Sequence, residues 1–349
     1  MPGLEKTMFT RRKPVVTVFL IYLLCFAFRV WEYFVLRTDH SFVGEAFIHK
    51  LIGIAILCIA VKIMALTFKE IGFSKEHIVR DLLKGLLFGT SIFAVAYGVE
   101  VAISVLQGNF GALRLYVTAY AVDGNVGHQT ALIFFAICIV GNIINVIMEE
   151  GMFRGLFQQI LQKKYSFLLS AVISSCLFGL WHIIAPIRNY YDGISSMGGF
   201  IANAAMLIVT SGLVGFKFTM MTKMTGSLYM AMGDHFVNNT IVNILHVISN
   251  TGADELQFVR ITIAQTLSFI VVLICYLKNH RKIESGRYMQ GKWILCPVCG
   301  NKTRNRIGSD TVLINYPLYC PKCKQETLIS VKQLNITILK EPAAKTQRR

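Results

Sequence analysis

The sequence predicts an all-α polytopic membrane protein with about eight transmembrane helices and a small β zinc ribbon at the C-terminus. Hydrophobic residues make up 54% of the 349 positions and charged residues only 15%, a composition that soluble domains of this size do not have. Apolar runs long enough to cross a bilayer recur through the first 277 residues. After them the chain becomes polar and carries two Cys-x-x-Cys pairs.

Each predicted span is an apolar run of about 20 residues, the length that crosses the hydrocarbon core. The runs are residues 15–35, 47–66, 83–106, 131–148, 167–185, 200–220, 227–248 and 258–277. The first is too long for the hydrophobic part of a signal peptide and lacks a small-residue cleavage pattern, so it is interpreted as a span. The fourth is expected to continue as one long helix to Leu161.

Positive charge collects at the N-terminus, in alternate loops and in the tail, and the net charge is +16. The positive-inside rule then predicts that both termini face the cytosol. Basic residues that flank spans attract anionic lipid headgroups. Membrane lipids are therefore expected partners, and the charge gives no reason to expect nucleic acid.

Beyond the predicted helix bundle, the chain is divided by its composition into three short segments. The predicted units are residues 1–277 (helix bundle), 278–292 (basic cytosolic linker), 293–339 (cysteine-rich module) and 340–349 (basic tail). Within the module, residues 312–319 and 328–339 have the composition of strands.

The two cysteine pairs of the module have the spacing of a zinc ribbon. Cys296 and Cys299 are separated from Cys320 and Cys323 by 20 residues. Two disulfides are the alternative, but the predicted cytosolic side is reducing. Four thiolates fill a tetrahedral site, so the predicted zinc is structural.

An acidic pair, Glu149 and Glu150, follows the fourth apolar run. Ionisable side chains at membrane depth are costly and suggest function. Glu150 and Arg154 are four residues apart, share a helix face and are expected to pair. Glu149 projects about 100° around the helix from its neighbour, on the side of Asn142 and Asn145. We therefore expect a structural role for Glu150 and a chemical one for Glu149.

Two later spans carry histidines that can face this pair. His182 follows Phe178 by one turn, and His235, Asn239 and Asn243 recur every four residues, with His246 expected one turn further on. Glu149 with His182 to activate water, and His235 with Asn239 to polarise a carbonyl, would form a complete hydrolytic set.

Several of these residues also have structural interpretations. A single histidine in a span is more often a hydrogen-bonded packing residue than a catalyst, and asparagine stripes often join helices. Trp181 is expected to serve in packing or as an interfacial anchor, and His246 to be structural.

At these motifs the chain resembles the CAAX prenyl protease 2 and bacteriocin-processing family of intramembrane proteases, also called the abortive-infection family. The motifs are Glu149-Glu150-x-x-x-Arg154, Phe178-x-x-x-His182 and His235-x-x-x-Asn239. The resemblance implies hydrolysis of a peptide or protein substrate, with Glu149 and His182 activating water, His235 and Asn239 forming the oxyanion site, and Glu150, Arg154 and Phe178 in support.

This resemblance leaves the choice between a glutamate-dependent and a metalloprotease mechanism open. A catalytic zinc is compatible with two histidines, a glutamate and an asparagine, although the His-Glu-x-x-His spacing of soluble zinc proteases is absent.

The tail is similar to the cysteine-rich KTR module of bacterial proteins, through Lys302-Thr303-Arg304 and both cysteine pairs. That similarity implies a bacterial plasma membrane and leaves the partner of the ribbon open. The alternative function is a non-catalytic membrane protein, an immunity factor or sensor, that binds a peptide and signals through the ribbon. A transporter is disfavoured because inverted repeats are not found.

Overall fold

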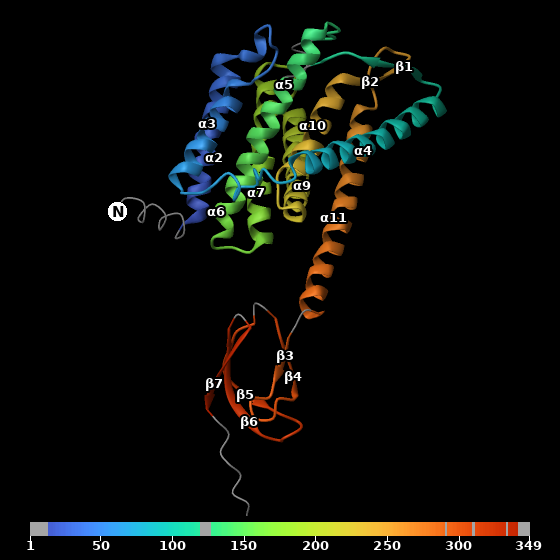
Figure 1. The fold of residues 1–349 in the computed structure, drawn as a ribbon. Helices are drawn as coiled ribbons and strands as arrows, with labels where there is room; N and C mark the ends of the chain where they lie inside the picture. Colours follow the sequence, from blue (N-terminus) through green and yellow to red (C-terminus); the bar gives the residue numbers. More distant parts are fainter. Residues whose placement is uncertain (1–12, 119–126, 290–291, 309–310, 333, 341–349) are drawn as a thin grey trace, which may run out of the picture. The chain divides into compact units, whose positions relative to one another are not determined.

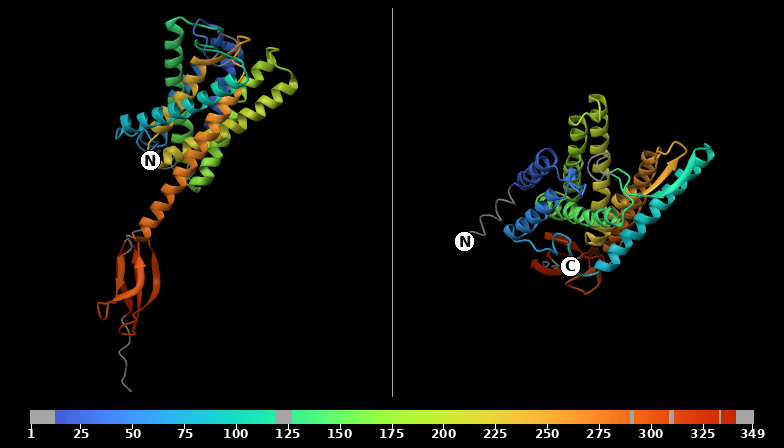
Figure 2. Two further views of the ribbon diagram at one scale, coloured as in Figure 1. Left: turned by 90° about the vertical axis from the view of Figure 1, so that its right-hand side faces the viewer. Right: turned by 90° about the horizontal axis from the view of Figure 1, so that it is seen from above.

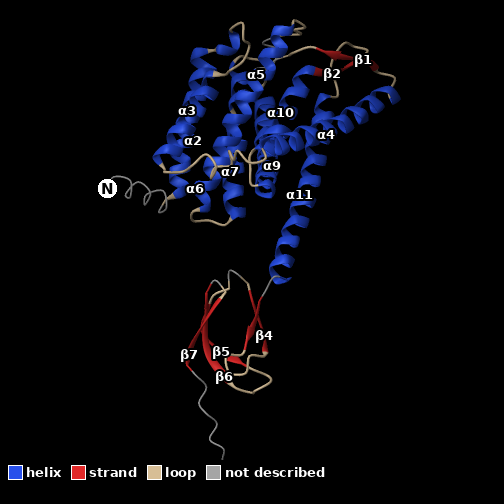
Figure 3. Ribbon diagram, in the orientation of Figure 1, coloured by secondary structure: helices blue, strands red, loops and turns tan. Residues whose placement is uncertain are grey.

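The computed structural model describes residues 13–118, 127–289, 292–308, 311–332 and 334–340. The chain divides into two compact units, Met1–Tyr276 and Leu277–Arg349. Helices dominate the first unit, whereas the second contains strands β3 to β7 (Figures 1 and 3). The prediction of a mostly helical chain with a small C-terminal β region is confirmed.

Six helices of the described residues are long and apolar enough to cross a membrane, which indicates a multi-pass membrane protein. They are Pro14–Leu36, Ile78–Leu106, Leu132–Gln162, Phe167–Tyr191, Met197–Thr225 and Gln257–Asn279. The other two predicted spans correspond to α3 (Ile48–Ile63) and α10 (Tyr229–Ile244), each of 16 residues. At 1.5 Å per residue such a helix is about 24 Å long, shorter than a hydrocarbon core of about 30 Å. The predicted count of eight is not confirmed.

The long helices are interrupted where the backbone changes its winding. The remaining α-helices are α2 (Pro14–Trp31), α4 (Ile78–Leu106), α5 (Leu132–Glu149), α6 (Gln158–Gln162), α7 (Phe167–Trp181), α8 (Ile184–Tyr191), α9 (Met197–Thr225) and α11 (Gln257–Met289). A π-helical segment, η3 (Glu150–Phe157), joins α5 to α6 without a break. The long helix expected to reach Leu161 is therefore present.

Local signals in the sequence account for several helix ends. The Ser166 side chain accepts a hydrogen bond from the Leu169 N–H at the start of α7, and Gly226 ends α9 with a φ of 71°. Between α7 and α8 the helix is interrupted at His182. Pro186 contributes to this break because it has no N–H to donate to the carbonyl of His182.

Two short strands cover one end of the bundle. β1 (Phe110–Leu115) pairs antiparallel with β2 (Leu245–Ser249), as Figure 1 shows. The predicted span 227–248 is therefore wrong in its last turn, because the chain leaves the helix at Leu245 to pair with β1. His246 lies on β2 and not one helical turn beyond Asn243.

Helices α4 and α10 are packed against each other; Figure 2 gives two further views of the bundle. Two glycines permit their close contact. A Cβ on Gly85 would lie 2.1 Å from the Met230 carbonyl oxygen, and one on Gly233 would lie 2.6 Å from that of Leu82. Larger residues would separate the two backbones. This contact fixes the position of α10, which carries His235.

The second unit contains two small sheets. β3 (Lys292–Leu295) pairs with β4 (Lys302–Ile307), and β5 (Leu313–Tyr319), β6 (Glu326–Lys332) and β7 (Asn335–Lys340) form a three-stranded antiparallel sheet. The predicted strand 328–339 is instead a hairpin, because Lys332 pairs with Asn335 and the chain turns between them. The core of the second unit includes the buried side chains of Ile294, Ile307 and Ile329.

We predict that Gly233→Leu lowers the free energy of unfolding by about 1–3 kcal/mol or more, because overpacking forces α4 and α10 apart. Gly98→Ala is the matched control, since a Cβ on Gly98 of α4 meets nothing within 4 Å. Thermal unfolding in detergent measures both. Equal melting temperatures for the two variants would contradict the assigned contact.

Candidate active site in the helix bundle

The two adjacent glutamates lie at the junction of α5 and η3. Glu149 is the last residue of α5 and Glu150 the first of the π-helical segment, and they are 3% and 0% exposed. π-Helical turns are rare and often mark functional sites. Gly151 permits close packing here, because a Cβ would lie 2.6 Å from the Leu57 side chain of α3.

Glu150 is held by an arginine and a histidine that both approach the same oxygen. Its Oε1 lies 3.3 Å from Nη1 of Arg154 and 2.8 Å from Nδ1 of His235. The ion pair expected from the four-residue spacing is therefore present. His235 is an additional partner, contributed by α10.

Arg154 is fixed in turn by an aromatic face and a glycine. Its guanidinium carbon lies 3.8 Å from the centroid of the Phe178 ring, and Nε donates to the Gly215 carbonyl at 3.3 Å. A Cβ on Gly215 would come within 2.7 Å of Nη2. Phe178 therefore supports Arg154 directly.

Glu149 has a separate set of partners. Trp181 Nε1 donates to Oε1 at 3.0 Å, and Arg29 Nη1 lies 3.9 Å from the same oxygen. Asn145 Nδ2 donates to Oε2 at 3.2 Å, and His235 Nε2 lies 3.6 Å from that oxygen. Asn145 therefore lies on the side of Glu149 that the helical spacing predicts.

Asn142, one turn before Asn145, is buried but bonds elsewhere. Its Nδ2 donates to Cys138 Sγ at 3.5 Å. It therefore extends the buried polar face of α5 without a hydrogen bond to Glu149 among the described contacts.

His182 lies at the C-terminal end of α7, where its ring and that of His235 both face the Phe178 ring, with centroid distances of 4.8 and 6.2 Å. Its Nδ1 is 2.8 Å from the Phe178 carbonyl oxygen. A carbonyl oxygen can only accept, so Nδ1 carries the proton and Nε2 of the neutral ring has a free lone pair.

His235 and Asn239 lie one turn apart on α10. The His235 ring stacks on Phe218 with centroids 4.8 Å apart, while Nδ1 and Nε2 face Glu150 and Glu149 respectively. Thus Glu149, His182 and His235 are brought together from three helical segments.

The side-chain oxygen of Asn239 already accepts a hydrogen bond from its neighbour Asn238. Asn239 Oδ1 accepts from Asn238 Nδ2 at 3.1 Å, and Oδ1 of Asn238 accepts from Gln265 Nε2 on α11 at 2.5 Å. This relay leaves the Asn239 amide N–H groups as the available donors.

The motifs did not identify four residues of this neighbourhood: Arg29, Trp181, Asn238 and Gln265. The expectation for Trp181 was incomplete, because its side chain is 1% exposed and donates to Glu149. A signal was present for Arg29, a lone cation in the apolar helix Pro14–Leu36. Asn238 and Gln265 have no local pattern that distinguishes them from other polar residues in spans.

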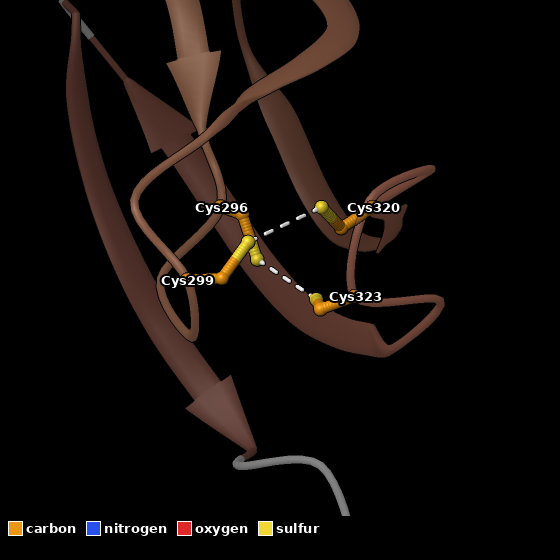
Figure 4. A group of neighbouring side chains, drawn as sticks. All are labelled: Cys296, Cys299, Cys320 and Cys323. Carbon is orange, nitrogen blue, oxygen red and sulfur yellow. Dashed lines mark hydrogen bonds between the residues drawn. The ribbon is translucent and has the colours of Figure 1, made fainter.

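A second cluster, in the C-terminal unit, consists of Cys296, Cys299, Cys320 and Cys323. Their sulfur atoms all lie within 4.8 Å of one another and could bind a metal ion (Figure 4). The pairs Cys296–Cys323 and Cys299–Cys320 are each separated by 3.6 Å, so they are not disulfides. The hydrogen bond from the backbone N–H of Asn301, and after it the bond from the Asn301 side chain, lower the pKa of Cys299 to about 6.

The two knuckles that carry these cysteines have equivalent backbones. The Cys296 N–H donates to the Asn301 carbonyl at 2.8 Å, and the Cys320 N–H donates to that of Gln325 at 3.0 Å. Gly300 and Lys324 occupy the same position with φ of 69° and 55°. Each knuckle therefore presents its two sulfurs from a tight turn.

We predict that Glu150→Ala lowers the free energy of unfolding by about 3–5 kcal/mol, because Arg154 would be left as a buried charge without its carboxylate. Thermal and denaturant unfolding in detergent measure the loss. Glu76→Ala is the control, since it breaks only an exposed pair with Lys69. A Glu150→Ala variant as stable as the control would contradict the structural role.

Comparison with protein families gives two matches. Residues 130–241 match the family described as Type II CAAX prenyl endopeptidase Rce1-like, and residues 291–344 match the family described as cysteine-rich KTR. Neither the curated proteins nor the solved structures yield a match to the chain. The first match supports an intramembrane protease of the CAAX type, which acts on a peptide or protein. The resemblance predicted from the motifs is confirmed: one segment of the chain is similar to the Rce1-like family and a later segment is similar to the cysteine-rich KTR family.

Proposed function

We propose that the protein is an intramembrane endopeptidase in which Glu149 activates the water that attacks a peptide bond. The observation that carries this proposal is that His235 lies against Glu149 and that the rings of His235 and His182 both face Phe178, although the three residues come from separate helical segments. A buried carboxylate beside a histidine with a free lone pair is suited to take a proton from water and return it to a leaving amine.

In the proposed first step, the two oxygens of Glu149 have different tasks. Oε1 accepts the shorter hydrogen bond, from Trp181, and is the oxygen that Arg29 approaches, whereas Oε2 accepts the longer bond from Asn145 and faces His235. Oε2 is therefore proposed as the atom that takes the proton. His182 Nε2 accepts a hydrogen bond from the same water and orients it. The oxygen of that water attacks the carbonyl carbon, and Glu149 then delivers the proton to the amine as the C–N bond breaks.

His235 and Asn239 are proposed to stabilise the oxyanion that forms on the carbonyl oxygen. Nδ1 of His235 donates to Glu150, so Nε2 would donate to the oxyanion in the protonated ring. The Asn239 amide supplies the other donor, held by Asn238 and Gln265. Preorganised donors of this kind contribute about 3–4 kcal/mol each to transition-state stabilisation.

A structural zinc in the ribbon is proposed from the geometry of the cysteine cluster. Zn–S bonds of about 2.3 Å in a tetrahedral site place the sulfurs about 3.8 Å apart, close to the 3.6 Å of both cysteine pairs. Among the described residues, these cysteines are the one group of three or more potential ligands that lie this close together.

The finer assignments follow from the same proposal. The substrate is a bacterial peptide or a protein terminus that reaches the bundle from the membrane or the cytosol. The protein resides in a bacterial plasma membrane with both termini in the cytosol, which the distribution of Lys and Arg in the loops supports.

The KTR segment is the feature that favours a second candidate, a non-catalytic immunity or sensor protein that binds a peptide in the bundle and signals through the ribbon. In that case Glu149→Gln would retain function and substitution of the ribbon cysteines would abolish it. The catalytic proposal requires the opposite result for Glu149.

We predict that Glu149→Gln and His182→Ala each lower kcat/KM by at least about 10²-fold, the contribution expected of a general base and its partner. The assay is cleavage of a membrane-anchored reporter peptide with a CAAX-type C-terminus in proteoliposomes. Glu76→Gln, an exposed carboxylate, is the control. Undiminished turnover in both site variants, with melting temperatures unchanged, would overturn the proposal.

The metal content of the purified protein should be one zinc per chain. We expect Cys320→Ser to lose this zinc, because three thiolates no longer complete the site, and Cys176→Ser, a lone cysteine of α7, to keep it. Elemental analysis with matched activity assays measures both. A second zinc that disappears in His182→Ala would instead establish a metal at the catalytic histidines.

A further inference from the structure

We propose that Arg29 is a positioning residue for the catalytic base: with Trp181 it anchors one oxygen of Glu149 and keeps the carboxylate ionised while the other oxygen reacts. This inference rests on the proposed role of Glu149. It adds to the site a residue of α2, which lies outside the segment 130–241 that matches the Rce1-like family.

The first argument is the position of Arg29 in an apolar helix. The helix Pro14–Leu36 is apolar enough to span a membrane, yet Arg29 is only 6% exposed within it. A buried guanidinium is costly unless a specific partner compensates it. Its carboxylate partner among the described contacts is Glu149, at 3.9 Å.

The second argument is the geometry around Oε1 of Glu149. The guanidinium carbon of Arg29 lies 4.5 Å from the centroid of the Trp181 ring. The indole Nε1 donates to Oε1 at 3.0 Å, and Nη1 of Arg29 approaches the same atom. Trp181 therefore donates a hydrogen bond to this oxygen, and the guanidinium over the indole ring adds an ion-pair contact to it. Oε2 faces Asn145 and His235 instead.

The third argument is charge balance between the two adjacent carboxylates. Glu150 has Arg154 as its guanidinium, and His235 lies against both glutamates. Without Arg29, the excess negative charge on Glu149 would be relieved by a proton. Arg29 therefore gives Glu149 a cation of its own and keeps it available as a base.

Other titratable and basic groups lie near Glu149 as well. They are His182 after α7, His235 of α10, Lys50 of α3 and Arg154 of η3. Lys50 is itself paired with Glu45 at 2.7 Å, and Arg154 with Glu150. Unlike Lys50 and Arg154, Arg29 approaches Glu149 and no second carboxylate among the described ion pairs.

The remaining contacts of Arg29 involve no further carboxylate among the described residues. Nη2 donates to the Tyr33 hydroxyl at 3.5 Å, the guanidinium carbon lies 5.3 Å from the centroid of the Tyr33 ring, and Nε is buried with no hydrogen-bond partner among the described atoms. Glu149 is therefore the described carboxylate that compensates the charge of Arg29.

The test is the pH dependence of kcat/KM in proteoliposomes for Arg29→Met and Arg29→Lys. Loss of the cation makes Glu149 easier to protonate, so the acidic limb of the Arg29→Met profile should move about 1–3 pH units higher. Arg29→Lys should restore part of this shift. KM should change less than kcat, because Arg29 acts through the base.

The control variant is Arg260→Lys. Arg260 is also a buried arginine, and it pairs with Glu100 and Asp254. This variant should alter the melting temperature without moving the acidic limb. If Arg29→Met only lowers the melting temperature and keeps the wild-type pH profile, the inference is overturned while the proposed function stands. Full activity of Glu149→Gln would instead remove the proposed function itself.

A second variant covers the case in which Arg29→Met fails to fold. Arg29→Met combined with Glu149→Gln removes both charges, so its melting temperature should recover relative to Arg29→Met alone. A double variant no more stable than the single variant would show that the two side chains are not coupled, and would also overturn the inference.

Discussion

The arrangement of the bundle depends on the burial of two adjacent carboxylates. Glu149 and Glu150 are almost completely removed from solvent, where two unpaired negative charges would not be tolerated. Each therefore has its own guanidinium: Arg154 contacts Glu150, and Arg29 contacts Glu149. Because the second cation comes from α2, this helix contributes to the site alongside the motif-bearing helices.

The need to compensate both carboxylates brings four segments together at this point: α2, the junction of α5 and η3, α7 and α10. The winding changes from α to π between the two glutamates. Trp181 and His182 come from the end of α7, and His235 from α10, which Gly233 holds against α4. Each carboxylate keeps a different set of partners, and this difference is the basis for assigning chemistry to Glu149 and structure to Glu150.

Interactions that depend on local spacing could be predicted from the sequence, whereas those made across the bundle could not. The four-residue separation predicts the Glu150–Arg154 pair, and the cysteine spacing predicts the sulfur cluster. The contact between Arg29 and Glu149 joins positions 120 residues apart, which spacing alone does not reveal. Hydropathy also could not separate strand β2 from the end of α10, because both are apolar.

The most direct test of the unlike roles of the two glutamates is chemical rescue with a small carboxylate. In proteoliposomes, added formate should restore measurable cleavage to Glu149→Ala, because a diffusible carboxylate can replace a missing base. It should not restore cleavage to Glu150→Ala, whose defect lies in the packing of Arg154 and His235. Rescue of Glu150→Ala alone would reverse the assignment and contradict the account.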